Sequence, residues 1–363
     1  NPAPASRYNL LVVGGGPAGI AAATAAARAG AATMLVERYG YLGGMATGGL
    51  VLYMDGLFDK EGERCIGGIH WESLERLRDM GGLAAQTPTR LHVDSELYKV
   101  VADNLCVESG VKLRLHSWAV DTLVEEGRVT GVIVESKSGR EAILAEVCVD
   151  ATGDGDVAAR AGAAYDAATM RIGLNLKIGG VYWAAYQQFA DEYPDRIRAL
   201  RQEVGRSGGY PLGFGTTPYS ERGVYWVNVL GLAGRESPDE EVSTFEGTLS
   251  AVDVEDLTYA EVELRRRLMR SVDFYQEHMP GYENLRLLAF APQLGVRDSR
   301  RIKGEHTLTR AEAEEGRDFD DAIGMTGRTF EAGLESPYHL QVPYRALVPE
   351  EIDGLLVGGR CIS

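Results

Sequence analysis

The residues best suited to hold a cofactor stand near the N-terminus, in the run Gly14-Gly15-Gly16-Pro17-Ala18-Gly19. The apolar residues 10–13 before it are typical of a buried strand, and the alanine-rich residues 20–29 after it favour a helix. In such a G-x-G-x-x-G turn the first glycine permits the bend, the second admits a pyrophosphate, and the third allows close packing of helix and strand. The helix then presents free N–H groups and its positive dipole end to the phosphates.

An acid follows at the distance that a dinucleotide site requires. Residues 33–36 form a second apolar run, and Glu37 ends it, about 20 residues after the glycines. A carboxylate there accepts the two hydroxyls of an adenosine ribose. The glycine run alone also fits a turn without a ligand, but strand, helix and acid together predict a dinucleotide site. Which dinucleotide binds is left open by this segment.

Three further glycine-containing segments are expected to bring the backbone close to a ligand or to neighbouring chain. Residues 40–49 carry five glycines with Leu42 and Met45 among them, which favours a packed loop. The strand-like run that ends at Asp150 is followed by an Ala-Thr-Gly turn and a short helix over 157–161. Residues 354–363 combine a buried strand with the turn Gly358-Gly359-Arg360.

Acid–base and anion-binding chemistry has few candidates. His339 precedes the return of the chain to the first domain, and its imidazole could take a proton; His306 is a weaker candidate. Arg297 and Arg300 could hold a carboxylate or carbonyl by bidentate hydrogen bonds. They could equally form salt bridges with acids nearby in the sequence, namely Asp298, Glu305 and Asp320.

The elements that position these residues follow from hydrophobic periodicity. Residues 71–80 and 94–108 are expected to form amphipathic helices, and 111–115 a strand. Three β-rich runs, separated by Gly127 and Ser138-Gly139, predict a three-stranded antiparallel meander over 119–124, 129–135 and 142–149. Residues 166–344 are expected to form a second domain with helices over 183–189, 195–204 and 257–278 and strands over 173–179, 223–230 and 287–292. The basic residues 296–309 resemble a further strand.

Composition excludes several classes of protein. The net charge of −16 over 363 residues argues against a general nucleic-acid binder. The sequence has no run of 18 apolar residues, so a membrane span is not expected. We expect no metal site, because zinc-type spacings are absent. The cysteines are widely separated and no signal peptide is visible, so reduced thiols and a cytoplasmic location are expected; they are Cys65, Cys106, Cys148 and Cys361.

Four separated pieces, GGGPAG with Glu37, LGGMATGG, DATGDGD after the meander, and the terminal LLVGGRCIS, resemble the FAD-dependent oxidoreductase family of the glutathione-reductase-like flavoprotein fold. GVRDSRRIKGEHTLT is similar to that family's arginine-rich strand. The resemblance implies an α/β fold: a Rossmann-like FAD-binding domain, with a parallel sheet and a β-meander, over 1–165 and 345–363. An α+β substrate or cap domain over 166–344 completes the expected architecture.

The resemblance also implies roles for single residues. The glycine turn holds the pyrophosphate, Glu37 the adenosine ribose, and Arg38 lies beside adenine or ribose. Val120 contacts adenine through its backbone. The remaining contacts run along the flavin and the diphosphate, and the whole set of cofactor residues is Gly14, Gly16, Pro17, Ala18, Gly19, Glu37, Arg38, Gly43, Gly44, Met45, Val120, Ala151, Thr152, Gly153, Gly359 and Arg360.

One feature departs from the family pattern. A glycine- and alanine-rich helix is expected after the G-R-C-I-S element, with its N-terminus toward the flavin, but this sequence stops at Ser363. A truncated chain is the simpler interpretation; a companion chain that supplies the helix is the alternative. The sequence has neither a second G-x-G-x-x-G nor a redox-active cysteine pair near residue 45, which favours an enzyme with one dinucleotide.

The function expected from these observations is oxidation or reduction of a small organic substrate by hydride transfer at flavin N5. His339 and Arg297 are the candidate catalytic residues, and oxygen or another acceptor completes the cycle. One alternative is an enzyme of the same fold that consumes NAD as a substrate, as thiazole synthases do. Another is a non-catalytic FAD-binding subunit of a larger complex. A homo-oligomer is compatible with each of these functions.

Overall fold

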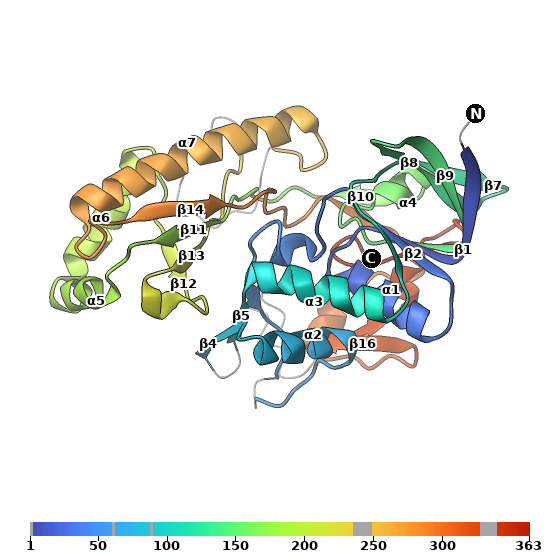
Figure 1. Cartoon of the computed structure of the whole chain (residues 1–363), viewed down its shortest axis with the longest axis horizontal. Coiled ribbons are helices and arrows are strands. Elements are labelled where there is room, and N and C mark those ends of the chain that lie inside the picture. The colour runs from blue at the N-terminus through green and yellow to red at the C-terminus, as the bar shows by residue number, and fades with distance from the viewer. Residues whose placement is uncertain (1–2, 60–61, 88–89, 235–248, 327–339) are drawn as a thin grey trace.

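The computed structural model describes residues 3–59, 62–87, 90–234, 249–326 and 340–363, and within them the largest sheet has seven strands (Figure 1). Four adjacent strands run parallel in the order β6 (Lys112–Arg114), β2 (Thr33–Val36), β1 (Ala3–Val13) and β9 (Gly139–Asp150). Strand β1 begins earlier than the apolar residues 10–13 suggested, because residues from Ala3 onward pair with β9. The expected Rossmann-like parallel sheet is therefore present.

The predicted meander is confirmed, and its third strand has a second role. Strands β7 (Trp118–Glu125) and β8 (Arg128–Ser136) pair antiparallel with each other, and β8 with the first half of β9. The second half of β9 pairs instead with β18 (Leu355–Val357), parallel to it. Strand β9 thus lies between β1 on one edge and β8 and β18 on the other, so the last strand of the chain is one strand away from β1.

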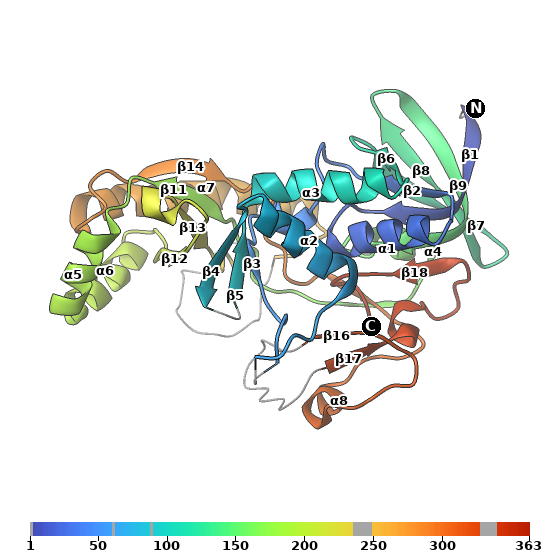
Figure 2. The ribbon, with the colours of Figure 1, turned by 60° about the horizontal axis from the view of Figure 1, so that its bottom comes forward.

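Alternation along the strands buries both faces of this sheet. Leu11 and Val13 belong to one hydrophobic cluster, with Met34 and Ile143, whereas Val12 belongs to the cluster on the other face. That second cluster also holds side chains of α1 (Pro17–Arg28), α2 (Gly68–Asp79) and α3 (Ser95–Glu108), which lie together in Figure 2. Helix α3 begins where Asp94 accepts hydrogen bonds from the N–H groups of Glu96 and Leu97, both at 2.9 Å.

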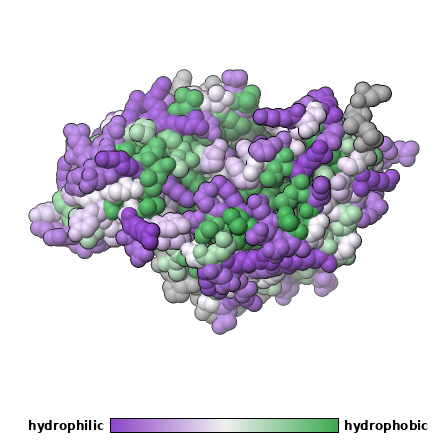
Figure 3. All heavy atoms as spheres, viewed as in Figure 1, coloured by the Kyte–Doolittle hydropathy of each residue, from purple (hydrophilic) through white to green (hydrophobic). Residues whose placement is uncertain are grey.

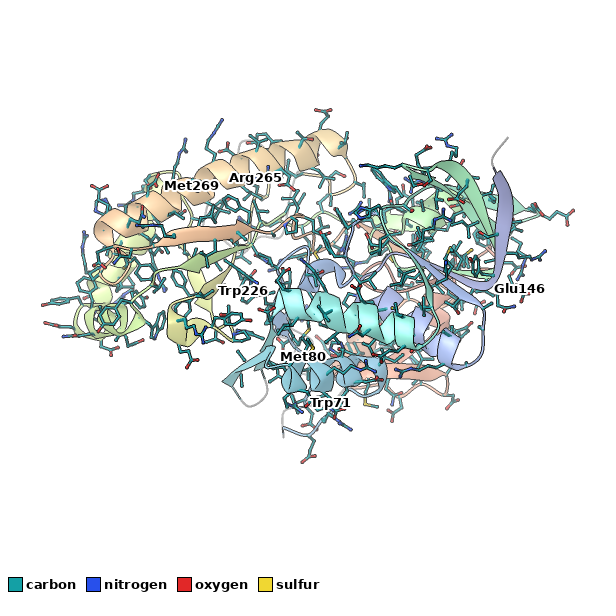
Figure 4. The ribbon with its side chains drawn as sticks, in the orientation of Figure 1. Trp71, Met80, Glu146, Trp226, Arg265 and Met269 are labelled. Atoms are coloured by element: carbon teal, nitrogen blue, oxygen red, sulfur yellow. The ribbon has the colours of Figure 1, made fainter. Side chains whose placement is uncertain are left out.

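A separate antiparallel sheet forms the other side of the molecule. Its strand order is β12 (Gly213–Gly215), β13 (Tyr225–Asn228), β11 (Leu176–Gly179) and β14 (Arg286–Phe290). The long helix α7 (Val254–His278) lies along one face, with α5 (Trp183–Glu192) and α6 (Pro194–Arg206) at the far end (Figure 1). Figure 4 shows Trp226 on the side of this sheet away from α7, which carries Arg265 and Met269. The predicted helices and strands of this region are all found, with shorter strands.

The remaining elements are short. They comprise η1 (Gly44–Ala46), β3 (Tyr53–Met54), β4 (Leu83–Thr87), β5 (Arg90–Val93), α4 (Asp156–Ala161), β10 (Tyr165–Ala167), η2 (Ser220–Arg222), β15 (Arg300–Ile302), α8 (Arg310–Glu315), β16 (Ala322–Thr326), β17 (Leu340–Pro343) and η3 (Tyr344–Leu347). Only three residues of the basic segment 296–309 form a strand, so the expected long strand there is wrong. Its other residues turn toward neighbouring loops. The domain bounds 1–165, 345–363 and 166–344 stay a prediction.

Hydrophobic side chains do not form one continuous surface in the view of Figure 3; they gather in patches bounded by hydrophilic residues. Within the described residues, no helix combines the length and the apolar composition needed to cross a bilayer.

Candidate cofactor and active site

A cavity of about 830 Å³ opens at the carboxyl ends of β1, β9 and β18 and continues toward α7. The strand ends are in register, since Val13 and Val357 both pair with Asp150. The turns that follow these three strands therefore meet at one edge of the sheet. This is where ligands bind in open α/β sheets.

The glycine turn after β1 combines two packed glycines with one open position. Gly14 has φ +105°, and a Cβ atom there would lie 2.4 Å from the Ala151 carbonyl oxygen; at Gly19 it would lie 1.9 Å from the Gly14 carbonyl oxygen. Gly16 differs, because its φ is −72° and a Cβ atom would meet only the Gly44 Cα, at 3.9 Å. The protein's own atoms thus require glycine at 14 and 19 but leave free space at 16.

Glu37 directly follows β2, and its side chain is buried at the cavity wall. Its carboxylate accepts hydrogen bonds from the N–H groups of Gly15 (2.6 Å) and Tyr39 (2.9 Å). The acid therefore fixes the glycine turn as well as facing the cavity.

The wall beside Glu37 is formed by Arg38 and by Trp118 of β7, whose side chain is 53% exposed. The Arg38 guanidinium lies 4.8 Å from the centre of the Tyr39 ring. Val120 lies two residues further along β7 and does not line the cavity, so its predicted adenine contact stays a prediction.

The loop over residues 43–49 is held on two sides. Gly43 donates to the Gly15 carbonyl at 2.8 Å, and the Thr47 hydroxyl donates to the Leu42 carbonyl at 2.8 Å. From the other sheet, the Gln293 amide donates to the Gly44 carbonyl at 3.1 Å. The loop is therefore packed, as expected, while Gln293 was not found by sequence reasoning because no local motif marks it.

Tyr41 stands beside this loop with a buried hydroxyl that has no hydrogen-bond partner among the described residues. Its ring stacks on Tyr39 at 5.3 Å and lies 4.9 Å from the Lys99 ammonium. Burial raises the pKa of Tyr41 to about 12. The hydroxyl stays protonated at neutral pH, and Tyr41 is among the residues that line the cavity.

Asp150 holds the turn after β9. Its carboxylate accepts from the Thr152 hydroxyl at 2.6 Å and from the first N–H groups of α4, those of Val157 and Ala158, at 2.8 and 2.9 Å. Burial raises the pKa of this carboxyl, and the hydrogen bonds oppose that effect. The result is a rigid turn over Ala151, Thr152 and Gly153, all of which line the cavity.

Asp154 joins this turn to two distant parts of the chain. Its carboxylate accepts a hydrogen bond from the Ser299 hydroxyl at 2.8 Å and forms an ion pair with Arg360. Its backbone carbonyl accepts a hydrogen bond from Arg300 at 3.0 Å. The Nε atoms of Arg300 and Arg360 are buried without a partner among the described residues. Asp154 was within a predicted motif, but its partners lie 145 and 206 residues away.

The arginines of the 297–301 segment differ in their partners. Arg300 pairs with Asp156 at 2.9 Å, and Arg301 pairs with Asp298 at 2.5 Å. Arg297 is exposed and lines the cavity, and no ion pair reaches it from the part of the chain that the structure describes. The salt bridges suggested for Arg297 are therefore absent there, whereas Arg300 is paired, although with Asp156 rather than the acids considered.

Neither candidate histidine is placed at the cavity by the described residues. His339 lies outside the described residues. His306 has its Nε2 atom 3.3 Å from a Glu312 carboxylate oxygen and its ring 5.3 Å from that of Phe319; it does not line the cavity. Across the described ranges, no group of three His, Cys, Asp or Glu side chains could hold a metal ion.

Most of the predicted cofactor residues come together around this one cavity. Gly19 and Gly43 stand just behind its lining, in the packing roles given above, and the residues that line it are Gly14, Gly16, Pro17, Ala18, Glu37, Arg38, Gly44, Met45, Ala151, Thr152, Gly153, Gly359 and Arg360. The binding roles of these residues stay predictions.

The second sheet and α7 supply the remaining wall. Asn175 donates to the Gly49 and Leu50 carbonyls, both at 3.0 Å, and so links the sheet to the loop. Glu261 of α7 lines the cavity and pairs with Arg265. Burial raises the pKa of Glu261. Sequence reasoning missed these residues, because nothing distinguishes them from ordinary helix and sheet positions.

Comparison with known proteins gives three findings. The family model described as FAD dependent oxidoreductase matches residues 9–363. A tRNA uridine 5-carboxymethylaminomethyl modification enzyme of Wolinella succinogenes is 33% identical over 153 residues, which are 39% of this chain but only 23% of that enzyme. The chain thus matches about a quarter of the length of that curated relative.

Two solved structures show the extent of the structural likeness. The p-nitrophenol 4-monooxygenase of Pseudomonas putida has a TM-score of 0.50 and 13% identity, with 84% of this chain and 71% of that chain covered. A geranylgeranyl bacteriochlorophyll reductase-like protein of Thermoplasma acidophilum has a TM-score of 0.47 and 15% identity, with coverage of 81% and 67%. At such identities the first of these likenesses shows the fold alone.

Proposed function

Since this chain belongs to the FAD-dependent oxidoreductase family, whose cofactor is FAD, we propose that it binds FAD along the cavity and oxidises or reduces a small organic molecule beside the flavin. The observation that carries the proposal is the continuity of the cavity from Glu37, past Gly16, to α7. A cavity that extends past these residues suits an extended dinucleotide and leaves room for a substrate at one end.

The adenosine diphosphate half belongs at the end with α1. Gly16 leaves the only open Cβ position in the turn, and no side chain caps α1, so its first N–H groups face outward. Glu37 offers carboxylate oxygens to the ribose hydroxyls. Trp118 and Arg38 form the wall for the adenine.

The flavin half belongs between the loop over 43–49 and the terminal turn with Arg360. FAD fits the donors there, because the Nε atoms of Arg300 and Arg360 and the hydroxyl of Tyr41 are buried and lack partners within the described chain. Buried donors of this kind require an acceptor. When bound, FAD supplies two-electron chemistry by hydride transfer at N5.

The chain itself positions both molecules and removes water. Gln293 and Asn175 tie the second sheet to the glycine loop, so α7 and the flavin loop face each other across a fixed gap. Tyr41, with a pKa raised to about 12, can hold a proton toward the cavity but does not serve as a base at neutral pH. His339 stays the proposed proton acceptor.

The substrate is proposed to be a small molecule rather than nucleic acid. The tRNA-modifying relative matches 39% of this chain, and the net charge of −16 gives no electrostatic attraction for RNA. A cytoplasmic location, reoxidation by oxygen or another acceptor, and a homo-oligomer remain predictions.

The spectrum of the purified protein tests the proposal. We expect a yellow protein with absorption near roughly 370 and 450 nm, as flavins have, which bleaches when an electron donor is added without oxygen. A colourless protein that carries an adenylated adduct would instead indicate an enzyme that consumes NAD. A bound flavin that no candidate substrate or partner protein reduces would indicate a non-catalytic subunit.

A further inference from the structure

Every acid that lines the cavity has a hydrogen-bond or ion-pair partner, whereas two arginines of the lining have no ion pair within the described residues. Its acids are all engaged: Glu37 with two N–H groups, Asp154 with Arg360, Asp156 with Arg300 at 2.9 Å and Arg160 at 3.4 Å, and Glu261 with Arg265. Arg38 and Arg297 line the same cavity, and the described residues provide neither with an ion pair. Two cations are therefore left for ligands.

These two arginines come from different segments of the chain. Arg38 follows Glu37 and packs on Tyr39, at the end assigned to adenosine. Arg297 belongs to the segment that leads from the second sheet: Gln293 binds the Gly44 and Gly48 backbone, and Gly295 donates to the Gly173 carbonyl at 2.7 Å. Arg297 thus belongs to the segment that runs from the second sheet to Ser299, whose hydroxyl binds Asp154.

Part of the wall of this cavity is apolar. The N-terminal end of α7 lies toward the body that holds β1 and β9 (Figure 1). The start of α7 and loops outside the strands contribute aliphatic residues to this lining, among them Val51, Val229, Val252, Leu257, Leu294 and Val296. A molecule that fills this space displaces water from the guanidinium, and a desolvated cation needs an anion to replace that water.

We propose that Arg297 is the anchor for the substrate, and that the substrate is a small carboxylate with an apolar body. The guanidinium offers a planar pair of donors that matches a carboxylate, and the aliphatic wall contacts the rest of the molecule. Asp298 does not compete, because it is engaged by Arg301. This proposal rests on the proposed function, since it assigns one end of the cavity to the cofactor.

The test compares a carboxylate with its neutral isostere on the FAD-loaded protein. Phenylacetate and phenylacetamide are titrated while the visible flavin spectrum is followed, and the dissociation constant of FAD is measured separately by fluorescence. In the wild type we expect phenylacetate to bind at least about tenfold more tightly than the amide. Arg297→Gln should bring the two constants within about twofold, and Arg297→Lys should keep part of the preference.

Lys303→Gln is the matched control. It removes one positive charge from the same segment, but Lys303 pairs with Asp166 at 3.2 Å and does not line the cavity. We expect this variant to keep the wild-type preference. A preference lost equally in both variants would reduce the effect to net charge and would overturn the assignment.

Three other results contradict the proposal. Equal affinity of the wild type for both probes, or binding of neither, would show that no carboxylate anchor exists. A rise of tenfold or more in the dissociation constant of FAD in Arg297→Gln would assign Arg297 to the cofactor. Protein that never takes up FAD would instead refute the proposed function, so the two failures are distinguishable.

Discussion

Replacement of Gly16 by valine separates binding of FAD from folding of the protein. At this position the backbone is extended, with φ −72° and ψ 178°, so valine can adopt it. A Cβ atom would meet only the Gly44 Cα, at 3.9 Å, within ordinary contact distance. The valine side chain would occupy the space that we assign to the pyrophosphate.

The expected change in stability is small. Valine caps a helix less well than glycine, which costs about 0.5–1 kcal/mol. Loss of glycine's freedom in the unfolded chain returns about 0.4–1 kcal/mol. The two effects nearly cancel, so the FAD-free variant and FAD-free wild type should unfold within about 1 kcal/mol of each other. Affinity for FAD should fall at least about 100-fold, equivalent to about 2.7 kcal/mol.

Gly19→Ala is the matched comparison, since its methyl group would lie 1.9 Å from the Gly14 carbonyl oxygen. That variant should lose stability whether or not FAD is present. The assays are the ratio of flavin to protein absorbance after purification, fluorescence titration with FAD, and urea unfolding of the FAD-free proteins. A Gly16→Val protein that retains one FAD per chain would refute the assignment of this turn to the phosphates.

Three further predictions follow from the same geometry. Glu37→Gln should raise the dissociation constant of FAD by about 10- to 100-fold and lower the unfolding free energy of the FAD-free protein by about 1–3 kcal/mol. Fluorescence titration measures the dissociation constant, and urea titration measures the unfolding free energy. An unchanged dissociation constant would exclude the ribose contact. Asp154→Asn and Arg360→Met should each destabilise the protein by about 2–3 kcal/mol, and additive effects in the double variant would show that the ion pair does not couple the terminal turn to α4. In Ellman's assay at pH 8 only Cys65 should react before unfolding. Burial raises the thiol pKa to about 11 for Cys106 and to about 12 for Cys148 and Cys361, which leaves about one thiolate in a thousand or fewer at each of them. Fast reaction of a second thiol would contradict the packing of these three cysteines.

The cofactor half of the site could be predicted from sequence because its requirements are local. Gly14 has φ +105°, a backbone conformation that favours glycine, and Gly19 touches Gly14 within the same helix entry. Such constraints act between residues a few positions apart, so they appear as fixed glycine spacings. The regular alternation of apolar residues likewise predicted the meander and the amphipathic helices, although β1 begins at Ala3 and the strand expected over 296–309 shrinks to Arg300–Ile302.

Pairing between distant segments was harder to predict. Periodicity identified residues 142–149 as the last strand of a meander, but it does not show that the second half of β9 exchanges β8 for β18. That exchange depends on the length of β9 relative to its partners. It also explains why Asp154 meets Arg360, since the two turns follow adjacent strand ends.

The substrate half could not be predicted because it uses side chains where the cofactor half uses backbone. Val229, Leu257 and Val296 are residue types that any core contains, and only their arrangement around a cavity distinguishes them. Arg297 was grouped with Arg300 in an arginine-rich segment, and sequence does not say which of the two has an acid beside it. The structure separates them, since Asp156 engages Arg300 and no acid within the described chain reaches Arg297. The specificity of the enzyme is therefore expected to depend on which charges the fold leaves unpaired, more than on any recognisable motif.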